Sequence, residues 1–286
     1  MKIGRFTSGS GTVRIGCLVA DESAVADLSA AGLASLQTVL DAHDPSATVR
    51  GALDRNPPRL PAGSVRWLAP VERQEVWAAG VTYLRSKAAR MEESDFSASA
   101  YDRVYAAERP ELFFKAVAER VVASGDAVGI RRDARWNVPE PELALVLNSR
   151  GAVVGCTLGN DMSSRDIEGE NTLYLPQAKV YDRSCALGPF IALDVSEEEL
   201  RRRRIRLEIT RAGAGVFAGE TSLGQLKRSF AELAGWLGRS QTFAHGAVLL
   251  TGTGIVPPDA FTLAAGDEVA ISLERFGTLR NAVVVV

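Results

Sequence analysis

Two apolar runs joined by a short turn constrain the fold of this chain more than any other segment. One run ends at Leu147, the other begins at Ala152, and the four residues Asn148-Ser149-Arg150-Gly151 lie between them. Apolar runs on either side of a glycine-containing turn are typical of a β-hairpin. If Leu147 pairs with Ala152, every other pairing in the two strands follows from the antiparallel geometry. The sequence therefore predicts two adjacent antiparallel strands within 138–161.

Three carboxylates lie at one end of this predicted hairpin. In the expected register Glu142 faces Thr157, and Glu140 then faces Gly159. Alternate residues of a strand share a face with directly opposed residues, so Asp161 leaves the second strand on the face of both glutamates. Repulsion within such a cluster favours protons or a bound cation, and a divalent hard cation is the natural compensation. A solvated strand face is the alternative explanation, and a slip of one residue would move Asp161 to the other face.

The chain contains two histidines, His43 and His245, and neither lies near another metal ligand or nucleophile in the sequence. This argues against Ser-His-Asp and Cys-His mechanisms and against a histidine-rich zinc site. A metal bound by this chain would take mostly oxygen ligands, which magnesium, manganese and calcium prefer. Phosphate-binding glycine motifs of nucleotide enzymes are absent from the sequence as well.

Charge and composition argue against nucleic-acid and membrane partners. The 33 Lys+Arg and 35 Asp+Glu leave a formal net charge of −2, which provides no general attraction to polyanions. The apolar runs are too short to cross a bilayer, and the first residues lack the apolar stretch of a signal peptide. The three cysteines show no CxxC spacing, so neither a disulfide framework nor a zinc knuckle is expected. We therefore expect a cytoplasmic protein.

The chain divides into two expected parts. Residues 1–68 suggest a small module that ends in a connection rich in proline and glycine. Residues 69–286 alternate short apolar runs with turns, as in a strand-rich domain with a few helices. Ser196 is a good N-cap for a solvated helix built on three Glu–Arg pairs with i,i+4 spacing. Strand-like alternation is seen at 12–19, and further helical patterns are at 29–40, 83–93, 98–108 and 222–237.

A series of motifs runs in one order from Val71 to the C-terminus. They are Ala79-Gly80-Val81-Thr82-Tyr83, Glu111-Leu112-Phe113-Phe114-Lys115, Pro139-Glu140-Pro141-Glu142, Gly159-Asn160-Asp161-Met162-Ser163-Ser164-Arg165-Asp166, Lys179, Leu187-Gly188-Pro189, Leu249-Leu250-Thr251-Gly252-Thr253-Gly254 and Leu263-Ala264-Ala265-Gly266-Asp267-Glu268-Val269. Together they resemble the core of the fumarylacetoacetate hydrolase family. The resemblance implies an α+β, β-rich fold, with a mixed β-roll catalytic domain over 69–286 behind a small N-terminal α/β domain over 1–68.

The same resemblance implies a metal site and an assembly. It places a divalent metal on Glu140, Glu142 and Asp161, with Lys179 beside it; Mg²⁺ is expected first, with Mn²⁺ or Ca²⁺ as alternatives. It also implies a homodimer or a higher homo-oligomer.

The segment Gly159 to Lys179 is most similar to the branch of the family that contains 2-keto-3-deoxy-D-arabonate dehydratases. Hydrolytic members carry a His–Glu pair that activates water as a general base, after an Asn-Tyr motif. In this chain Ser86 and Ala89 occupy the two corresponding positions. The departure supports the same branch, because dehydration requires no added water.

The branch implies a 2-keto acid as the small-molecule substrate, which can chelate a divalent metal through carboxylate and keto oxygens and so acquire acidic C3 protons. Lys179 is the expected base for C3, and neutralisation of the carboxylates is its alternative role. Glu111 is the expected acid for the departing hydroxyl, with helix capping or a surface position as alternatives. Arg165 and Asp166 are expected to pair and to brace the Asp161 loop. The residues expected to hold the substrate are Tyr83, Arg85, Lys115, Thr251 and Thr253.

The sequence thus predicts a metal-dependent lyase that dehydrates a 2-keto-3-deoxy sugar acid, a pentonate in the first instance, to 2-oxoglutarate semialdehyde. Hydrolysis of a C–C bond in an acylpyruvate or diketo acid is the alternative activity. A metal-stabilised binding protein without turnover is a third interpretation.

Overall fold

The computed structural model describes residues 1–9, 11–84 and 103–286. Its strands are β1 (Lys2–Thr7), β2 (Arg14–Leu18), β3 (Ala24–Asp27), β4 (Arg59–Pro61), β5 (Arg66–Trp67), β6 (Glu75–Gly80), β7 (Glu111–Ala116), β8 (Val121–Val122), β9 (Val128–Ile130), β10 (Asn137–Val138), β11 (Pro141–Leu147), β12 (Val153–Asp161), β13 (Ser163–Ser164), β14 (Cys185–Ala192), β15 (Arg204–Arg211), β16 (Ala214–Ser222), β17 (Ala247–Leu250), β18 (Glu268–Leu273) and β19 (Gly277–Val285). Its helices are α1 (Leu36–Leu40), α2 (Pro45–Leu53), α5 (Arg165–Glu170), α6 (Leu175–Lys179), α7 (Glu197–Arg201) and α8 (Phe230–Gly238).

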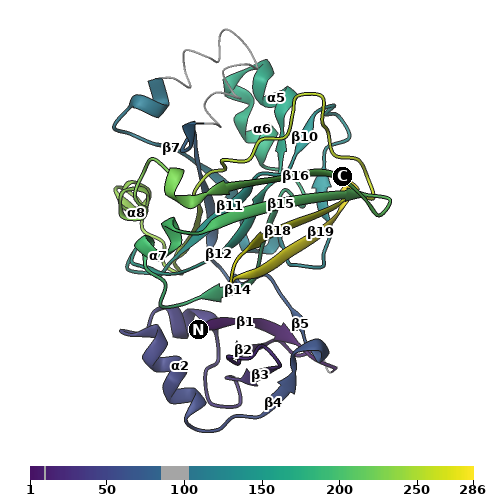
Figure 1. Cartoon of the computed structure of the whole chain (residues 1–286). Coiled ribbons are helices and arrows are strands. Elements are labelled where there is room, and N and C mark those ends of the chain that lie inside the picture. The colour runs from purple at the N-terminus through teal and green to yellow at the C-terminus, as the bar shows by residue number, and fades with distance from the viewer. Residues whose placement is uncertain (10, 85–102) are drawn as a thin grey trace.

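Two sheets hold most of these strands (Figure 1). Twelve of the described strands form the larger sheet, whose main path is β4-β3-β2-β1-β14-β12-β11-β17-β6-β7. Five others form the second sheet, in the order β16-β15-β18-β19-β9. The pairs β6–β17, β8–β14 and β9–β19 are parallel within an otherwise antiparallel arrangement. The fold is therefore mixed and strand-rich, as predicted.

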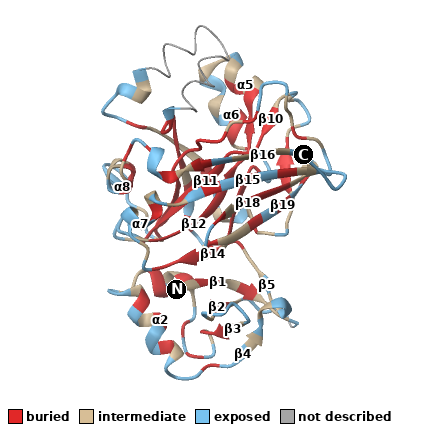
Figure 2. Ribbon diagram, in the orientation of Figure 1, coloured by how far each residue is buried: buried red, intermediate tan, exposed pale blue. Residues whose placement is uncertain are grey.

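Strand β11 separates the hydrophobic core into two parts because its side chains alternate between faces. Leu143, Leu145 and Leu147 pack with Leu207 of β15, between the two sheets. Ala144 and Val146 point the other way and join a cluster that includes the helices α1 and α2. Every residue of β11 is buried, as the red of this strand in Figure 2 shows. Glu140 and Glu142 belong to this second face.

The predicted hairpin forms as β11 and β12, but the predicted pairing was wrong by two residues. Glu142 pairs with Gly159 instead of Thr157. One residue of the displacement arises at the turn, and a β-bulge beside Leu147 adds the second. A shift of two residues returns each side chain to its original face. The carboxylates therefore still converge.

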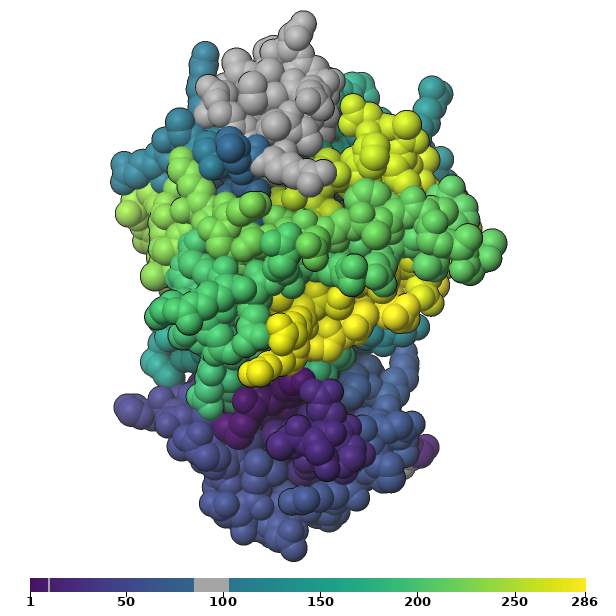
Figure 3. Space-filling model, viewed as in Figure 1, coloured from purple at the N-terminus to yellow at the C-terminus, as the bar shows by residue number. Residues whose placement is uncertain are grey.

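The N-terminal strands lie at one end of the molecule, seen in purple in Figure 3. Strand β1 pairs with β14 through Lys2–Ala192 and Ile3–Ile191, so these strands extend the larger sheet. The division of the chain near residue 68 stays a prediction. No described helix is long and apolar enough to cross a membrane.

Two predicted helices are shorter than their apolar patterns indicate. The pattern at 29–40 yields only α1, because the Ser35 side chain caps this helix by accepting a hydrogen bond of 3.1 Å from the Thr38 N–H. The pattern at 222–237 yields α8 from Phe230 onward, after the N-cap Ser229. Helix α7 begins after Ser196 and carries the predicted Glu–Arg pairs. The helices expected at 83–93 and 98–108 lie mostly outside the described residues, although 103–106 are helical.

Candidate active site

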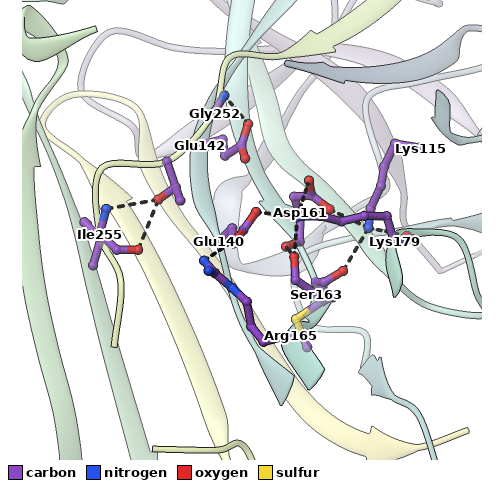
Figure 4. A network of polar contacts seen from close by, with 11 residues as sticks. Lys115, Glu140, Glu142, Asp161, Ser163, Arg165, Lys179, Gly252 and Ile255 are labelled. Carbon is purple, nitrogen blue, oxygen red and sulfur yellow. Dashed lines mark hydrogen bonds and ion pairs between the residues drawn. The ribbon is translucent and has the colours of Figure 1, made fainter. Parts of the chain in front are cut away.

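Glu140, Glu142 and Asp161 form one buried acidic cluster at the end of the β11–β12 hairpin (Figure 4). Each offers a carboxylate oxygen, and these three oxygens lie within 4.8 Å of one another. Glu140 precedes β11 directly and lies opposite Asp161, rather than opposite Gly159 as predicted, with the Asp161 N–H 3.0 Å from the Glu140 carbonyl. The local strand geometry thus brings the three predicted metal ligands together.

Three buried cationic side chains surround two of the carboxylates. Lys179, at the end of α6, places its Nζ 2.6 Å from Glu140 Oε2 and 3.4 Å from Asp161 Oδ2. Lys115, on β7, lies 2.5 Å from Asp161 Oδ1. Arg165, the first residue of α5, places Nη2 2.8 Å from Glu140 Oε1.

Glu142 differs from the other two carboxylates because it has no ion-pair partner among the described residues. Its Oε2 accepts a hydrogen bond of 2.5 Å from the backbone N–H of Gly252. Burial, followed by the negative charges of Asp161 and Glu140, raises the pKa of Glu142 well above its ordinary value. A buried carboxylate in this position is stabilised by an added cation. The oxygen donor set and the charge therefore fit a divalent hard metal ion such as Mg²⁺.

A narrow cavity opens on this cluster. The residues that line it are Ala79, Gly80, Val81, Phe113, Glu140, Glu142, Asp161, Gly252 and Thr253. Within the described part of the chain, neither histidine lines the cavity, and His245 contacts Gln37 instead. The site therefore offers carboxylate, ammonium and backbone N–H groups for chemistry.

Strand β7 places Glu111 and Phe113 on one face, because alternate residues of a strand point the same way, and Lys115 follows at a β-bulge opposite Val76 and Trp77. Glu111 lies opposite Gly80 of β6. A Cβ at residue 80 would lie 1.8 Å from Glu111 Oε2, so the glycine leaves the space that this carboxylate occupies beside the cavity. Phe113 lies with its ring centre 5.6 Å from Lys179 Nζ.

The loop that carries Thr251, Gly252 and Thr253 is fixed by its own hydrogen bonds. The Thr251 hydroxyl donates to the Leu143 carbonyl at 2.9 Å, and the Thr253 hydroxyl lies 3.2 Å from the Ile255 nitrogen. Gly252 has a φ of +90°, and a Cβ there would lie 2.0 Å from Thr82 Oγ1. Glycine at this position allows the loop to present its N–H to Glu142.

The remaining predicted site residues divide into two groups. Tyr83 is 2% exposed, and its pKa is raised, first by burial and then by the charge of Glu142. Arg85, Ser86 and Ala89 lie outside the described residues. The substrate-binding roles predicted from the sequence stay predictions for all five residues, which are Tyr83, Arg85, Lys115, Thr251 and Thr253.

The sequence predicted that Arg165 and Asp166 pair with each other and brace the Asp161 loop. The structure shows Arg165 donating to Glu140 Oε1 at 2.8 Å, whereas Asp166 accepts a hydrogen bond of 2.6 Å from the Arg135 N–H. A further contact of Lys179 was not predicted from the sequence. The Ser163 hydroxyl lies 2.5 Å from Lys179 Nζ. Ser163 and Arg165 both belong to the motif that follows Asp161. Their positions two and four residues after a predicted metal ligand are the sequence signal that could have indicated these contacts.

The comparison with protein families settles the membership of this chain. The model for the C-terminal region of fumarylacetoacetate (FAA) hydrolase matches residues 75–284, which include every described residue of the acidic cluster. The chain belongs to the fumarylacetoacetate hydrolase family.

Two curated proteins that are similar in sequence to this chain are dehydratases by name. A probable 2-keto-3-deoxyxylonate dehydratase of Haloferax volcanii is 49% identical over 217 residues, which are 76% of this chain and 74% of the relative. A 2-dehydro-3-deoxy-D-arabinonate dehydratase of Saccharolobus solfataricus is 39% identical over 221 residues, 75% of this chain and 73% of the relative.

A solved structure of a 2-keto-3-deoxy-D-arabinonate dehydratase, complexed with magnesium and 2,5-dioxopentanoate, is similar over the whole length. The match covers 100% of this chain and 99% of the chain in that structure, with a TM-score of 0.81 and 30% sequence identity. The family and the strand-rich fold predicted from the motifs are thereby confirmed.

Proposed function

We propose that this protein is a magnesium-dependent hydro-lyase that converts a 2-keto-3-deoxypentonate to 2,5-dioxopentanoate, the semialdehyde of 2-oxoglutarate. The observation that carries the proposal is the contact of Lys179 Nζ with Glu140 and Asp161 in a buried acidic cluster. This contact supports Lys179 as the base, because Nζ lies beside two of the carboxylates that would hold the metal ion and its chelated keto acid. The names of the similar dehydratases, one of them bound to magnesium and 2,5-dioxopentanoate, support the same substrate class.

Glu140, Glu142 and Asp161 would hold the ion, which when bound polarises the keto group of a chelated 2-keto acid and acidifies the C3 protons. Lys179 then takes a proton from C3. Glu111, placed beside the cavity by Gly80, gives a proton to the C4 hydroxyl, which leaves as water while a C3–C4 double bond forms. A proton shift from C5 to C3 then gives the enol of the C5 aldehyde, which takes a proton at C4 and loses its hydroxyl proton to give 2,5-dioxopentanoate. These steps account for the loss of one water molecule from the substrate.

The substrate is held by the rim of the cavity in this proposal. Thr251 and Thr253 flank Gly252, whose backbone N–H donates to Glu142, and this loop would receive the substrate's carboxylate or hydroxyl groups. Tyr83 adjoins the same loop through Gly254, where a Cβ would lie 2.7 Å from the tyrosine ring. Arg85 is proposed as a further contact from the sequence alone.

We also propose the domain division and the setting of the enzyme. Residues 1–68 would form a small N-terminal α/β domain, and 69–286 a β-roll catalytic domain. A homodimer in the cytoplasm is the expected state, on the grounds of the family resemblance.

Hydrolysis of an acylpyruvate is disfavoured by Ser86 and Ala89, which replace the His–Glu pair that delivers water in hydrolytic relatives. Product analysis separates the candidate activities. Purified protein with Mg²⁺ should convert 2-keto-3-deoxypentonate to 2,5-dioxopentanoate and release little pyruvate from acylpyruvates. Rapid pyruvate formation without consumption of any keto-deoxy sugar acid would establish the hydrolase instead. Binding of keto acids without turnover of either substrate class would support a binding protein.

A further inference from the structure

Lys115 is a fully buried lysine whose ammonium contacts protein groups on two segments of the site. Its Nζ donates to the backbone carbonyl of Met162 at 2.9 Å and to the backbone carbonyl of Lys179. It also forms the ion pair with Asp161 Oδ1 at 2.5 Å. An ammonium group has three hydrogens, and three protein acceptors surround this one.

The contact with the Lys179 carbonyl concerns the end of a short helix. Lys179 is the last residue of α6, and the next N–H, that of Val180, turns back to the Pro176 carbonyl at 2.8 Å. The last carbonyls of a helix lack partners within the helix, and they carry its negative dipole end. Lys179 is itself fully buried, so its carbonyl needs a donor from another element. Lys115 of β7 supplies that donor.

The two lysines also lie on opposite oxygens of one carboxylate. Lys115 is paired with Asp161 Oδ1, whereas Lys179 approaches Oδ2 at 3.4 Å (Figure 4). Lys115 thereby joins three parts of the site: a carboxylate proposed as a metal ligand, the β12–β13 turn at Met162, and the backbone of Lys179. The residues that line the cavity include neither lysine.

We propose that Lys115 is a positioning residue for Lys179, and that it acts by holding the end of α6 against the Asp161 turn. The proposal rests on the function proposed above, in which Lys179 takes the C3 proton. A buried clamp of this kind keeps the Lys179 amino group beside Glu140 and Asp161. The proposal assigns Lys115 a role different from the substrate contact predicted from the sequence, because two of its three acceptors are backbone carbonyls of other elements, those of Met162 and Lys179.

The test compares Lys115→Met with Lys115→Gln in the full-length protein with Mg²⁺. The methionine removes every donor, whereas the glutamine keeps two N–H donors for the two carbonyls but no charge. We expect Lys115→Met to lower kcat about 100-fold, as small displacements of catalytic groups do, with the KM unchanged within about threefold. Exchange of the substrate's C3 protons with solvent deuterium should fall in parallel. Lys115→Gln should recover about a tenth of the lost rate or more.

Mg²⁺ binding, measured by calorimetry without substrate, separates positioning from general damage. Removal of a positive charge beside Asp161 leaves the affinity for Mg²⁺ equal or higher if the fold is intact. Lys2→Met is the control for loss of a lysine, because Lys2 lies on β1, far from Lys115 in the sequence. This variant should match the wild type in every measurement. Thermal unfolding of both variants shows whether they fold, and Lys115→Gln carries the test if the methionine variant does not.

Two kinetic outcomes would overturn the proposal. A raised KM with an unchanged kcat would mean that Lys115 holds the substrate. A loss of kcat together with an equal loss of Mg²⁺ affinity would mean that it supports Asp161 alone. If the wild type dehydrates no keto-deoxy sugar acid, the proposed function fails, and a crystal structure of Lys115→Met still decides this inference. In that variant structure, Lys179 Nζ should no longer contact Glu140 and Ser163. Retention of both contacts would refute the positioning role.

Discussion

The backbone N–H of Asp161 donates to the backbone carbonyl of Glu140 at 3.0 Å, so these two residues lie directly opposite each other at the open end of the hairpin. Their side chains share a face with Glu142, which lies two residues along the strand from Glu140. Covalent spacing and one interstrand hydrogen bond therefore assemble the acidic cluster.

Glu142→Gln should weaken Mg²⁺ binding by more than the roughly 10- to 100-fold that is lost when a residue behind a metal ligand is changed. The amide keeps the shape of the side chain, and the Gly252 N–H remains beside it, but the charge that attracts the ion is gone. Calorimetric titration with Mg²⁺ measures the change. Glu208→Gln, an exposed carboxylate on β15, is the control and should bind as the wild type does. Unchanged affinity in the Glu142 variant would exclude this residue as a ligand.

Lys179→Met should abolish turnover and the exchange of the substrate's C3 protons with solvent deuterium, while Mg²⁺ binding persists. The reason is that Nζ contacts Glu140 and Asp161, two of the carboxylates proposed to hold the metal ion that a keto acid would chelate. Proton NMR in deuterated buffer follows the exchange separately from product formation. If exchange continues at the wild-type rate, the base is another residue and Lys179 only balances charge.

Gly80→Ala should lower kcat about 100-fold, because the added Cβ would lie 1.8 Å from Glu111 Oε2 and displace that carboxylate from the cavity. The affinity for Mg²⁺ should stay as in the wild type, since the three ligands lie on other strands. Steady-state kinetics and calorimetry together check both statements. Gly235→Ala is the matched control on α8, where an added Cβ meets no atom within 4 Å. Full activity of Gly80→Ala would remove Glu111 from the mechanism.

Asp267 should make folding stability depend on acid pH. Burial by itself raises its pKa, but hydrogen bonds from Arg211 and from the Ala264 N–H outweigh burial and hold the pKa below its ordinary value. The stabilisation is therefore present above the unfolded pKa of about 3.9 and is lost as the pH falls through the lower folded value. Asp267→Asn should cost about 2 kcal/mol of unfolding free energy at neutral pH, and less in acid. Urea unfolding across this pH range measures it; a cost independent of pH would contradict the argument.

Local sequence pattern alone was enough to predict the hairpin, its turn, the capped helix α7 and the three converging carboxylates. These features depend on residues close together in the chain. Glu140 and Glu142 share a face because of strand geometry, and Ser196 caps a helix whose ion pairs are four residues apart. The resemblance of the motifs added Lys179 and the family, which no spacing within the chain implies.

Tertiary structure alone decided the register and the groups around the carboxylates. The bulge beside Leu147 shifts the β11–β12 pairing by one residue, and β12 also pairs with β14 on its other edge; the turn residues signal neither feature. Arg165 and Lys115 reach the cluster from α5 and from β7, and which oxygen each one takes depends on how those elements pack. Sequence thus determined which side chains share a face, since that is set within one strand. Packing determined what lies opposite them, since that depends on elements distant in the chain.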